Sequence, residues 1–235
     1  MESQATTELK ARIVTAALDH VPFDGWSDAA LCAALSDCDV DTETGRALFP
    51  RGAVDLALAF HRQGDADLLR ALRNADLSEM RYRDRVAYGV RLRLEAVADH
   101  KEAVRRGTTL FALPIHAADG AKAIWETADS IWEGLGDRAN DFNWYSKRAT
   151  LAGVYSATVL YWLGDQSPDH AATWAFLDRR IDDVMQIEKL KKSVNENPAL
   201  KPLMAGPNWL LGKIRPPARV ARIDLPGYIR PKDQQ

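Results

Sequence analysis

Apolar side chains recur every three or four residues through almost the whole chain up to residue 194. Leu9, Ile13, Ala16 and Ala17 begin this pattern. Such spacing places side chains on one face of a helix, whereas a half-buried strand would alternate apolar and polar residues. No convincing alternation of that kind is found along the chain. The pattern therefore predicts an all-α protein.

Capping and turn residues divide the first third into short helices. Residues 21–25 contain Pro22 and Gly25 and are expected to break the first helix. Ser27 is a good N-cap for a short helix through Leu35, and a polar turn at residues 37–41 precedes a short helical piece at 42–48. The next helix is expected to open at residues 49–52 and to end at Gly64.

Longer periodic segments follow. Residues 66–77 predict one helix, and residues 82–105 carry one apolar stripe that includes Val86 and Val97. Five arginines lie mostly off this stripe and are expected to form a solvated face: Arg81, Arg83, Arg85, Arg91 and Arg93. Residues 121–135 predict a further helix, and residues 149–164 form a charge-free run that suits a central core helix. Ser167 and Pro168 give the N-cap and first position of the last long helix.

These elements divide the chain into three parts. Residues 1–64 resemble a helix-turn-helix head of the tetracycline-repressor type, and residues 65–194 form a larger helical body with a ligand cavity and a dimer face. Residues 195–235 form a tail interrupted by prolines. The fold class expected is therefore all-α, a tetracycline-repressor-like helical bundle with a degenerate head and a ligand-binding body.

Charge argues against nucleic acid as a partner. The chain of 235 residues carries a formal net charge of −2, and residues 37–50 hold four acidic side chains against Arg46 alone. A DNA-reading element needs basic side chains near phosphates. A ligand-responsive transcriptional regulator of the tetracycline-repressor type remains the alternative function, but we expect the head not to bind DNA well.

The tail has the opposite composition. Residues 189–222 carry eight basic side chains and one acid, and prolines interrupt strongly apolar stretches. Trp, Leu and basic residues together suit a membrane interface, although a tail strapped over the protein's own hydrophobic surface is the other interpretation. The candidate membrane-binding residues are Leu203, Met204, Trp209, Leu210, Leu211 and Ile214.

The segment from Gly136 to Arg148 holds an unusual group of residues. Trp144 and Tyr145 are adjacent, so at least one ring is expected at the edge of the buried face or on the surface. Arg148 lies one helical turn after Trp144 and can stack on its ring. Exposed aromatics beside arginine are typical of a binding hot spot. The alternative is a helix start with a partly buried Trp and a solvated Arg.

Recognisable catalytic chemistry is not found in the sequence. Cys32 and Cys38 fit no zinc or redox spacing, and the five histidines are dispersed. There is no phosphate-binding glycine loop, no pair of Glu-x-x-His elements for a di-iron site and no recognisable nucleophile. We therefore expect no enzymatic activity and no cofactor or metal.

Several blocks of residues resemble one family over residues 7–190, the accessory proteins of coenzyme Q (ubiquinone) biosynthesis known as the coenzyme Q protein nine family. The matching blocks are Gly25-Trp26-Ser27, Leu48-Phe49-Pro50-Arg51-Gly52-Ala53, Leu113-Pro114, Gly136-Asp137, Asp141-Phe142-Asn143-Trp144-Tyr145, Lys147-Arg148, Leu151-Ala152, Asp165-Gln166-Ser167-Pro168, Trp174, Phe176-Leu177 and Arg180. The tail resembles the family only in type, because prolines interrupt the amphipathic helix with which a family member ends.

The resemblance implies a tetracycline-repressor-like fold without DNA binding, a cavity for an isoprenoid or other lipid, and a homodimer. It also implies a partner, the di-iron demethoxyubiquinone hydroxylase, to which a quinone intermediate from the membrane is presented. The partner-binding positions implied are Leu113, Pro114, Asp141, Trp144, Tyr145 and Arg148.

The resulting hypothesis is a lipid-binding accessory protein of ubiquinone biosynthesis. It is expected in the bacterial cytoplasm at the inner membrane, or on the matrix side in a mitochondrion. The cavity is expected to be lined by apolar faces within residues 86–97, 124–135, 151–163 and 174–184. Tyr145→Ala and Arg148→Glu are predicted to abolish capture of the hydroxylase without changing the melting temperature.

Overall fold

The computed structural model describes residues 4–137 and 142–196, and within them all regular secondary structure is helical, which confirms the all-α prediction. The helices are α1 (Gln4–Asp24), α2 (Asp28–Asp37), α3 (Thr42–Leu48), α4 (Ala53–Asn74), α5 (Tyr82–Glu95), η1 (Ala98–His100), α6 (Lys101–Phe111), α7 (Ala117–Gly134), α8 (Phe142–Gly164), η2 (Pro168–His170) and α9 (Ala171–Glu196).

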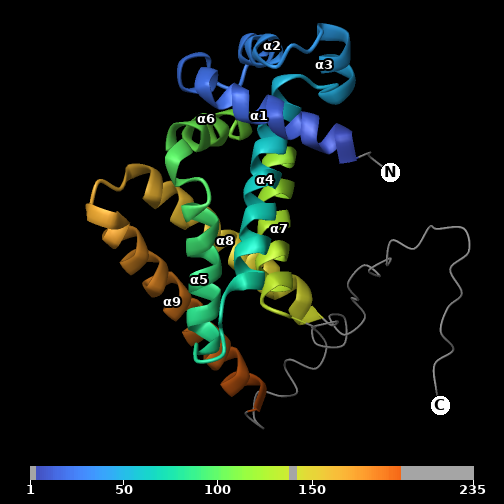
Figure 1. Cartoon of the computed structure of the whole chain (residues 1–235). Helices are drawn as coiled ribbons and strands as arrows, with labels where there is room; N and C mark the ends of the chain where they lie inside the picture. The colour runs from blue at the N-terminus through green and yellow to red at the C-terminus, as the bar shows by residue number, and fades with distance from the viewer. Residues whose placement is uncertain (1–3, 138–141, 197–235) are drawn as a thin grey trace, which may run out of the picture.

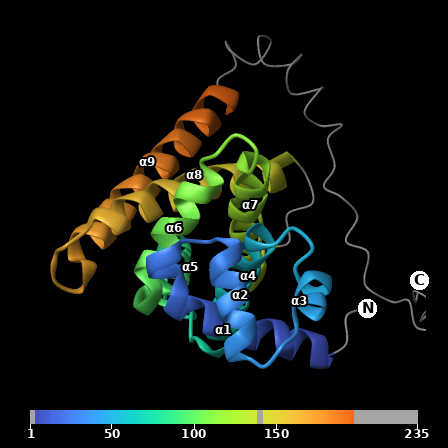
Figure 2. The ribbon, with the colours of Figure 1, turned by 90° about the horizontal axis from the view of Figure 1, so that it is seen from above.

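The helices form a head and a body that share α4. Helices α1, α2 and α3 lie together at one end of the molecule, and α4 runs from them along α7 into the body (Figure 1). Helix α1 also packs on α6. Helices α8 and α9 pack on each other and lie on the side of the body away from α3 (Figure 2). This arrangement is a tetracycline-repressor-like helical fold.

Local capping residues form the head as predicted. The hydroxyl of Ser27 accepts a hydrogen bond from the backbone N–H of Ala30 and caps α2. The carboxylate of Asp41 accepts one from the N–H of Thr44 and caps α3. Helix α1 ends within the predicted break at residues 21–25, although it continues through Pro22, and the φ of the following Gly25 is +67°.

Helix α4 is longer than expected. Gly64 was expected to end this helix, but α4 continues to Asn74 and Gly64 is buried within it. A Cβ at Gly64 would lie 2.5 Å from Nη1 of Arg93, so glycine provides the space that this guanidinium occupies. A continuous helix therefore passes through residue 64, where the head was expected to end.

Helix α5 corrects two further expectations. The single helix expected over residues 82–105 ends at Glu95, and the short turn of η1 then leads into α6. Arg93 is buried, whereas the solvated face was expected to include it. Its Nε lies 2.6 Å from Oδ1 of Asp65, and burial of a charge requires such a partner. Arg81 and Arg91 are exposed, as expected.

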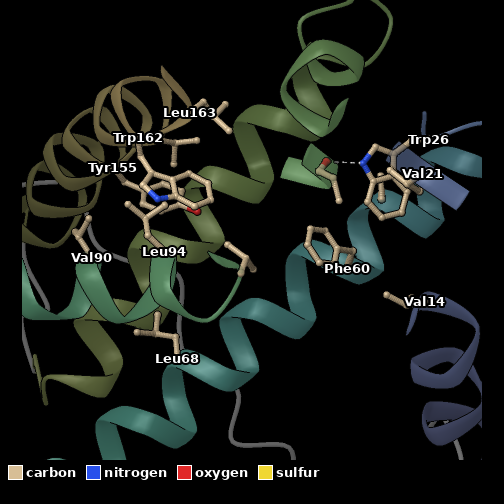
Figure 3. Close-up of a cluster of buried hydrophobic side chains, with 14 of the residues drawn as sticks. Val14, Val21, Trp26, Phe60, Leu68, Val90, Leu94, Tyr155, Trp162 and Leu163 are labelled. Carbon is tan, nitrogen blue, oxygen red and sulfur yellow. Dashed lines mark hydrogen bonds between the residues drawn. The ribbon is translucent and has the colours of Figure 1, made fainter. Parts of the chain in front are cut away.

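One hydrophobic core extends through the head and the body. At the junction, Trp26 packs on Phe60 with 5.4 Å between ring centroids. The indole N–H of Trp26 donates to the backbone carbonyl of Ala103 over 2.9 Å (Figure 3). In the body, Trp162 and Leu94 are among the largest fully buried side chains. The head is thus fixed to the body by shared packing.

Candidate ligand cavity and aromatic surface

A cavity of about 410 Å³ lies where the head meets the body. This volume lies within the usual range for small-molecule sites, which are mostly apolar with a few placed polar groups. Its lining is apolar except for a few side chains. Buried lining residues include Ala57, Phe60, Leu94 and Val97.

The lining only partly matches the faces predicted from the sequence. Leu94 and Val97, Ile124, and Val159 come from the first three predicted faces, and α9 contributes none of the lining residues. The junction contributes lining residues that were missed: Trp26, Phe60, Gly107 and Phe111. The Gly25-Trp26-Ser27 block could have indicated the role of the junction, because a tryptophan beside a turn buries its large ring against another element.

Exposed apolar side chains lie in the cavity lining and in the turn next to it. Leu160 lines the cavity and is 65% exposed. Ala112 and Ala117, which line the cavity, flank the turn between α6 and α7. Within this turn, Ile115 is 79% exposed. Exposed apolar residues that gather in this way are typical of interaction surfaces.

A polar cluster lies against the cavity. His61 and Arg93 line it, and Asp65 pairs with Arg93. The hydroxyl of Thr127 donates to the same Asp65 oxygen over 2.8 Å. Burial, together with the positive charge of Arg93, lowers the pKa of His61 to about 4. Burial raises the pKa of the phenol of Tyr155, which also lines the cavity. All these groups come from four different helices and were not predicted to meet.

A second cavity of about 360 Å³ lies between α5, α7, α8 and α9. Other residues of the predicted apolar faces line this second cavity: Val86, Trp132, Leu151 and Ile181. Lys147 also lines it and forms an ion pair with Asp137 over 2.7 Å. The apolar faces predicted for one cavity are therefore divided between two.

An aromatic cluster forms where α8 begins. The rings of Trp144 and Tyr145 meet edge to face, with 4.8 Å between centroids, and Trp125 of α7 lies within 6.3 Å of both. Trp144 is buried and Tyr145 is partly buried, so one ring reaches the edge of the core as expected. The guanidinium carbon of Arg148 lies 4.0 Å from the centre of the Trp144 ring, as the helical spacing predicted.

Arg148 is buried, although the alternative interpretation of the sequence had its side chain in solvent. Its exposed fraction is 0%. Nε donates to Oδ1 of Asp129 over 2.5 Å, and Nη1 lies 3.4 Å from Oδ2 of Asp137. Burial alone would raise the pKa of Asp137, but Lys147 and Arg148 hold it below its usual value. Asp137 therefore pairs with both cations.

The other predicted partner residues lie apart from this cluster. Leu113 and Pro114 precede the start of α7, whereas Arg148 pairs with Asp129, about 18 Å further along that helix. Asp141 lies outside the described residues, as do all six candidate membrane-binding residues of the tail. The two halves of the predicted partner surface thus lie near opposite ends of α7.

The described residues contain neither a cluster of metal ligands nor a helix that could span a membrane. No group of three or more His, Cys, Asp or Glu side chains is placed to hold a metal ion in residues 4–137 and 142–196. Among the helices that the structure describes, none is long and apolar enough to span a membrane.

The fold and the cavity define a tetracycline-repressor-like helical protein. The chain is similar in structure to the TetR transcriptional regulator from Nitrosomonas europaea, with a TM-score of 0.60 over 74% of this chain and 97% of that one. Sequence identity between the two is 20%, so the likeness concerns the fold alone.

Sequence comparison gives the family. The COQ9 family profile matches residues 117–188. The mitochondrial ubiquinone biosynthesis proteins COQ9 of Drosophila melanogaster and Homo sapiens are 33% and 30% identical over 77% and 81% of this chain. COQ9-B of Xenopus laevis is 30% identical, and the match covers 67% of that protein. The chain belongs to the COQ9 family. It spans 57% of the Drosophila protein and 62% of the human protein.

Proposed function

We propose that this chain is a lipid-binding accessory protein of ubiquinone biosynthesis. It binds an isoprenoid or quinone intermediate, or another lipid such as a phospholipid, and presents the intermediate to the demethoxyubiquinone hydroxylase at the membrane. The observation that carries the proposal is the apolar cavity of about 410 Å³, whose lining includes the exposed side chain of Leu160. Relatives named for ubiquinone biosynthesis support the choice of ligand.

The mechanism is desolvation. An isoprenoid chain exposed to water costs about 0.8 kcal/mol per methylene group, so such a lipid hardly crosses water unaided. Phe60, Leu94 and Val159 offer an apolar wall to the part of the lipid that enters the cavity. The protein's part is to bind the lipid, exclude water and release it next to an enzyme. No chemical step on the lipid is assigned to this chain.

The aromatic cluster is our candidate for the hydroxylase contact. Trp125 and Tyr145 are partly exposed, and aromatic side chains dominate binding hot spots. Leu113 and Pro114 then form a separate contact beside the cavity opening. We propose a homodimer through α8 and α9, because Tyr161 is exposed and stacks on Phe176 with 4.5 Å between centroids.

The location proposed is the membrane surface, with the basic tail adding affinity for anionic lipid. Each basic residue near such a surface contributes about 1 kcal/mol. In a bacterium this is the cytoplasmic face of the inner membrane. In a eukaryote it is the matrix side of a mitochondrial membrane, as the names of the relatives suggest.

A cavity-blocking variant tests lipid binding. Ala121→Trp places a large ring at a lining residue that is exposed, so the fold should tolerate it. Lys122→Trp is the matched control, since Lys122 is the next residue, is exposed and does not line the cavity. After incubation with vesicles that contain an isoprenoid quinone, the wild type and Lys122→Trp should retain lipid and Ala121→Trp should not. Equal retention by both variants would contradict the proposed site.

The hydroxylase contact is tested with Tyr145→Ala. Because Tyr145 is only partly buried, this variant should keep its melting temperature within a few degrees and lose capture of the hydroxylase. Phe23→Ala, which removes an exposed aromatic ring on α1 in the head, is the control and should retain capture. Undiminished capture by Tyr145→Ala would contradict the proposal that this surface contacts the hydroxylase.

A further inference from the structure

The cavity has a polar wall whose charges cancel. Arg93 lines it, but its Nε donates to Asp65 and its Nη2 donates to the backbone carbonyl of His61 over 2.9 Å. The carboxylate of Asp65 is 2.6 Å away and neutralises the guanidinium. An anionic lipid headgroup therefore finds no unpaired positive charge here. The wall is suited to a neutral polar group.

His61 adds a hydrogen-bond acceptor to this wall. Its Nε2 lies 3.1 Å from the carbonyl oxygen of Ala123 and 2.8 Å from the hydroxyl of Thr127. A carbonyl oxygen only accepts hydrogen bonds, so Nε2 carries the proton and Nδ1 has a free lone pair. None of the described residues donates to Nδ1. The low pKa of His61 keeps the ring neutral and Nδ1 unprotonated.

We propose that the cavity takes its lipid head first, with a hydroxyl group of the ligand donating a hydrogen bond to Nδ1 of His61. The ligand class is a neutral amphiphile that carries a hydroxyl group on an isoprenoid chain. This inference rests on the lipid-binding function proposed above and adds the orientation of the ligand and the group that selects it.

Size and hydration agree with this orientation. A cavity of about 410 Å³ has room for a headgroup and the start of a chain, but not for a long polyprenyl tail. A tail that leaves past Leu160 can remain in the bilayer while the headgroup enters the protein. Binding then avoids the cost of about 0.8 kcal/mol for every methylene that would otherwise enter water.

The test compares farnesol with farnesyl methyl ether, which has the same chain but cannot donate a hydrogen bond. Dissociation constants are measured by displacement of anilinonaphthalene sulfonate from the full-length protein. One hydrogen bond contributes about tenfold in affinity, so the wild type should bind farnesol about tenfold more tightly than the ether.

Two variants assign the effect to His61. His61→Gln places an amide near the position of Nε2, able to contact Ala123 and Thr127, but has no acceptor at the position of Nδ1. It should bind both molecules equally. His20→Gln, in the head and paired with Asp37, is the control and should keep the tenfold preference.

Equal affinity of the wild type for the alcohol and the ether would overturn the head-first orientation and leave lipid binding intact. A tenfold preference that persists in His61→Gln would assign the hydrogen bond to another residue and also overturn the proposal. Binding of neither molecule would overturn both the orientation and the lipid-binding function. The comparison in the wild type is decisive even if a variant fails to fold.

Discussion

Replacing Arg148 should destabilise the protein strongly, although the residue lies in a segment that the sequence marks as a binding surface. Its guanidinium is fully buried and links Asp129 on α7, Asp137 in the following turn and the Trp144 ring on α8. Removing one member of a buried ion pair costs about 3–5 kcal/mol. The size of the effect here depends on what happens to the two carboxylates left behind.

For Arg148→Met the loss should be moderate. Asp129 is 36% exposed and can be hydrated, and Asp137, although only 9% exposed, keeps its ion pair with Lys147. Methionine fills most of the space and contacts the Trp144 ring. We therefore expect the free energy of unfolding to fall by about 2–3 kcal/mol, near the lower end of the range for buried pairs.

Arg148→Glu should destabilise the protein much more than Arg148→Met, because it places a third carboxylate between two others in a buried site. A loss greater than about 5 kcal/mol is comparable with the entire stability of a small domain, so this variant should be largely unfolded. The assay is urea denaturation followed by circular dichroism. Arg70→Glu is the control: Arg70 is also paired, but it is 70% exposed, and its loss should be below about 1 kcal/mol.

A loss below about 1 kcal/mol for Arg148→Glu would refute the reasoning, because it would mean that water reaches this guanidinium. The expected result also changes how the partner surface must be tested. Loss of hydroxylase capture in Arg148→Glu would report loss of the fold. Tyr145→Ala is therefore the informative variant.

Four further predictions follow from the structure and the sequence. Gly52→Ala should lower the free energy of unfolding, measured by urea denaturation, by about 2 kcal/mol, because the φ of Gly52 is +61° and the new Cβ would lie 2.5 Å from Oδ1 of Asp28. Gly153→Ala, in an open helical position, should instead raise it by about 0.5–1 kcal/mol. A change of the same sign in both variants would contradict the argument. The pKa of His61 is about 4 when folded and 6.5 when unfolded, so the unfolded state binds protons more readily between these values and stability falls as the pH falls through this window. Between pH 7 and 5, His61 should lower the free energy of unfolding of the wild type by about 2 kcal/mol, and His61→Gln should lack this part of the decrease. Parallel pH curves for the two proteins would contradict this prediction. Truncation after Val194 should abolish flotation with anionic vesicles, and unchanged flotation would exclude the tail as the membrane contact. A gel-shift assay with duplex DNA should show no salt-dependent retardation, given Asp39, Asp41 and Glu43 around α3, and retardation would instead favour a transcriptional regulator.

The sequence predicts features that depend on neighbouring residues. Ser27 caps α2, and α3 occupies residues 42–48 as expected. Ser167 lies at the N-cap of the short turn η2 as expected, but the last long helix, α9, begins only at Ala171 because Asp169 and His170 have positive φ. The stacking of Arg148 on Trp144 follows from their spacing of four residues. Each of these depends only on local geometry, which is why it could be read along the chain.

Features that depend on distant partners could not be predicted. Gly64 reads as a helix end, but its reason is Arg93, twenty-nine residues later, whose guanidinium needs the space. Arg93 reads as solvated until Asp65 is placed against it. The head contributes Trp26 to the cavity only because α1 and α6 pack together.

The blocks of residues that mark the family also have structural roles that no motif shows. Arg51 of the Leu-Phe-Pro-Arg-Gly-Ala block pairs with Asp55 and with Asp119, which ties the start of α4 to α7. Asp165 of the Asp-Gln-Ser-Pro block accepts hydrogen bonds from Ser167 and Thr173, and these bonds lower its pKa. A block that is specific to a family therefore need not lie on a binding surface.

The central claim is that the cavity holds a lipid. The most direct measurement is mass spectrometry of an organic extract from purified, detergent-free protein, with Ala121→Trp and Lys122→Trp prepared in parallel. The account predicts a quinone precursor or other isoprenoid lipid in near-stoichiometric amount in the wild type and in Lys122→Trp, and its loss in Ala121→Trp. A folded wild type that contains no lipid, and takes up none from vesicles with an isoprenoid quinone, would contradict the account.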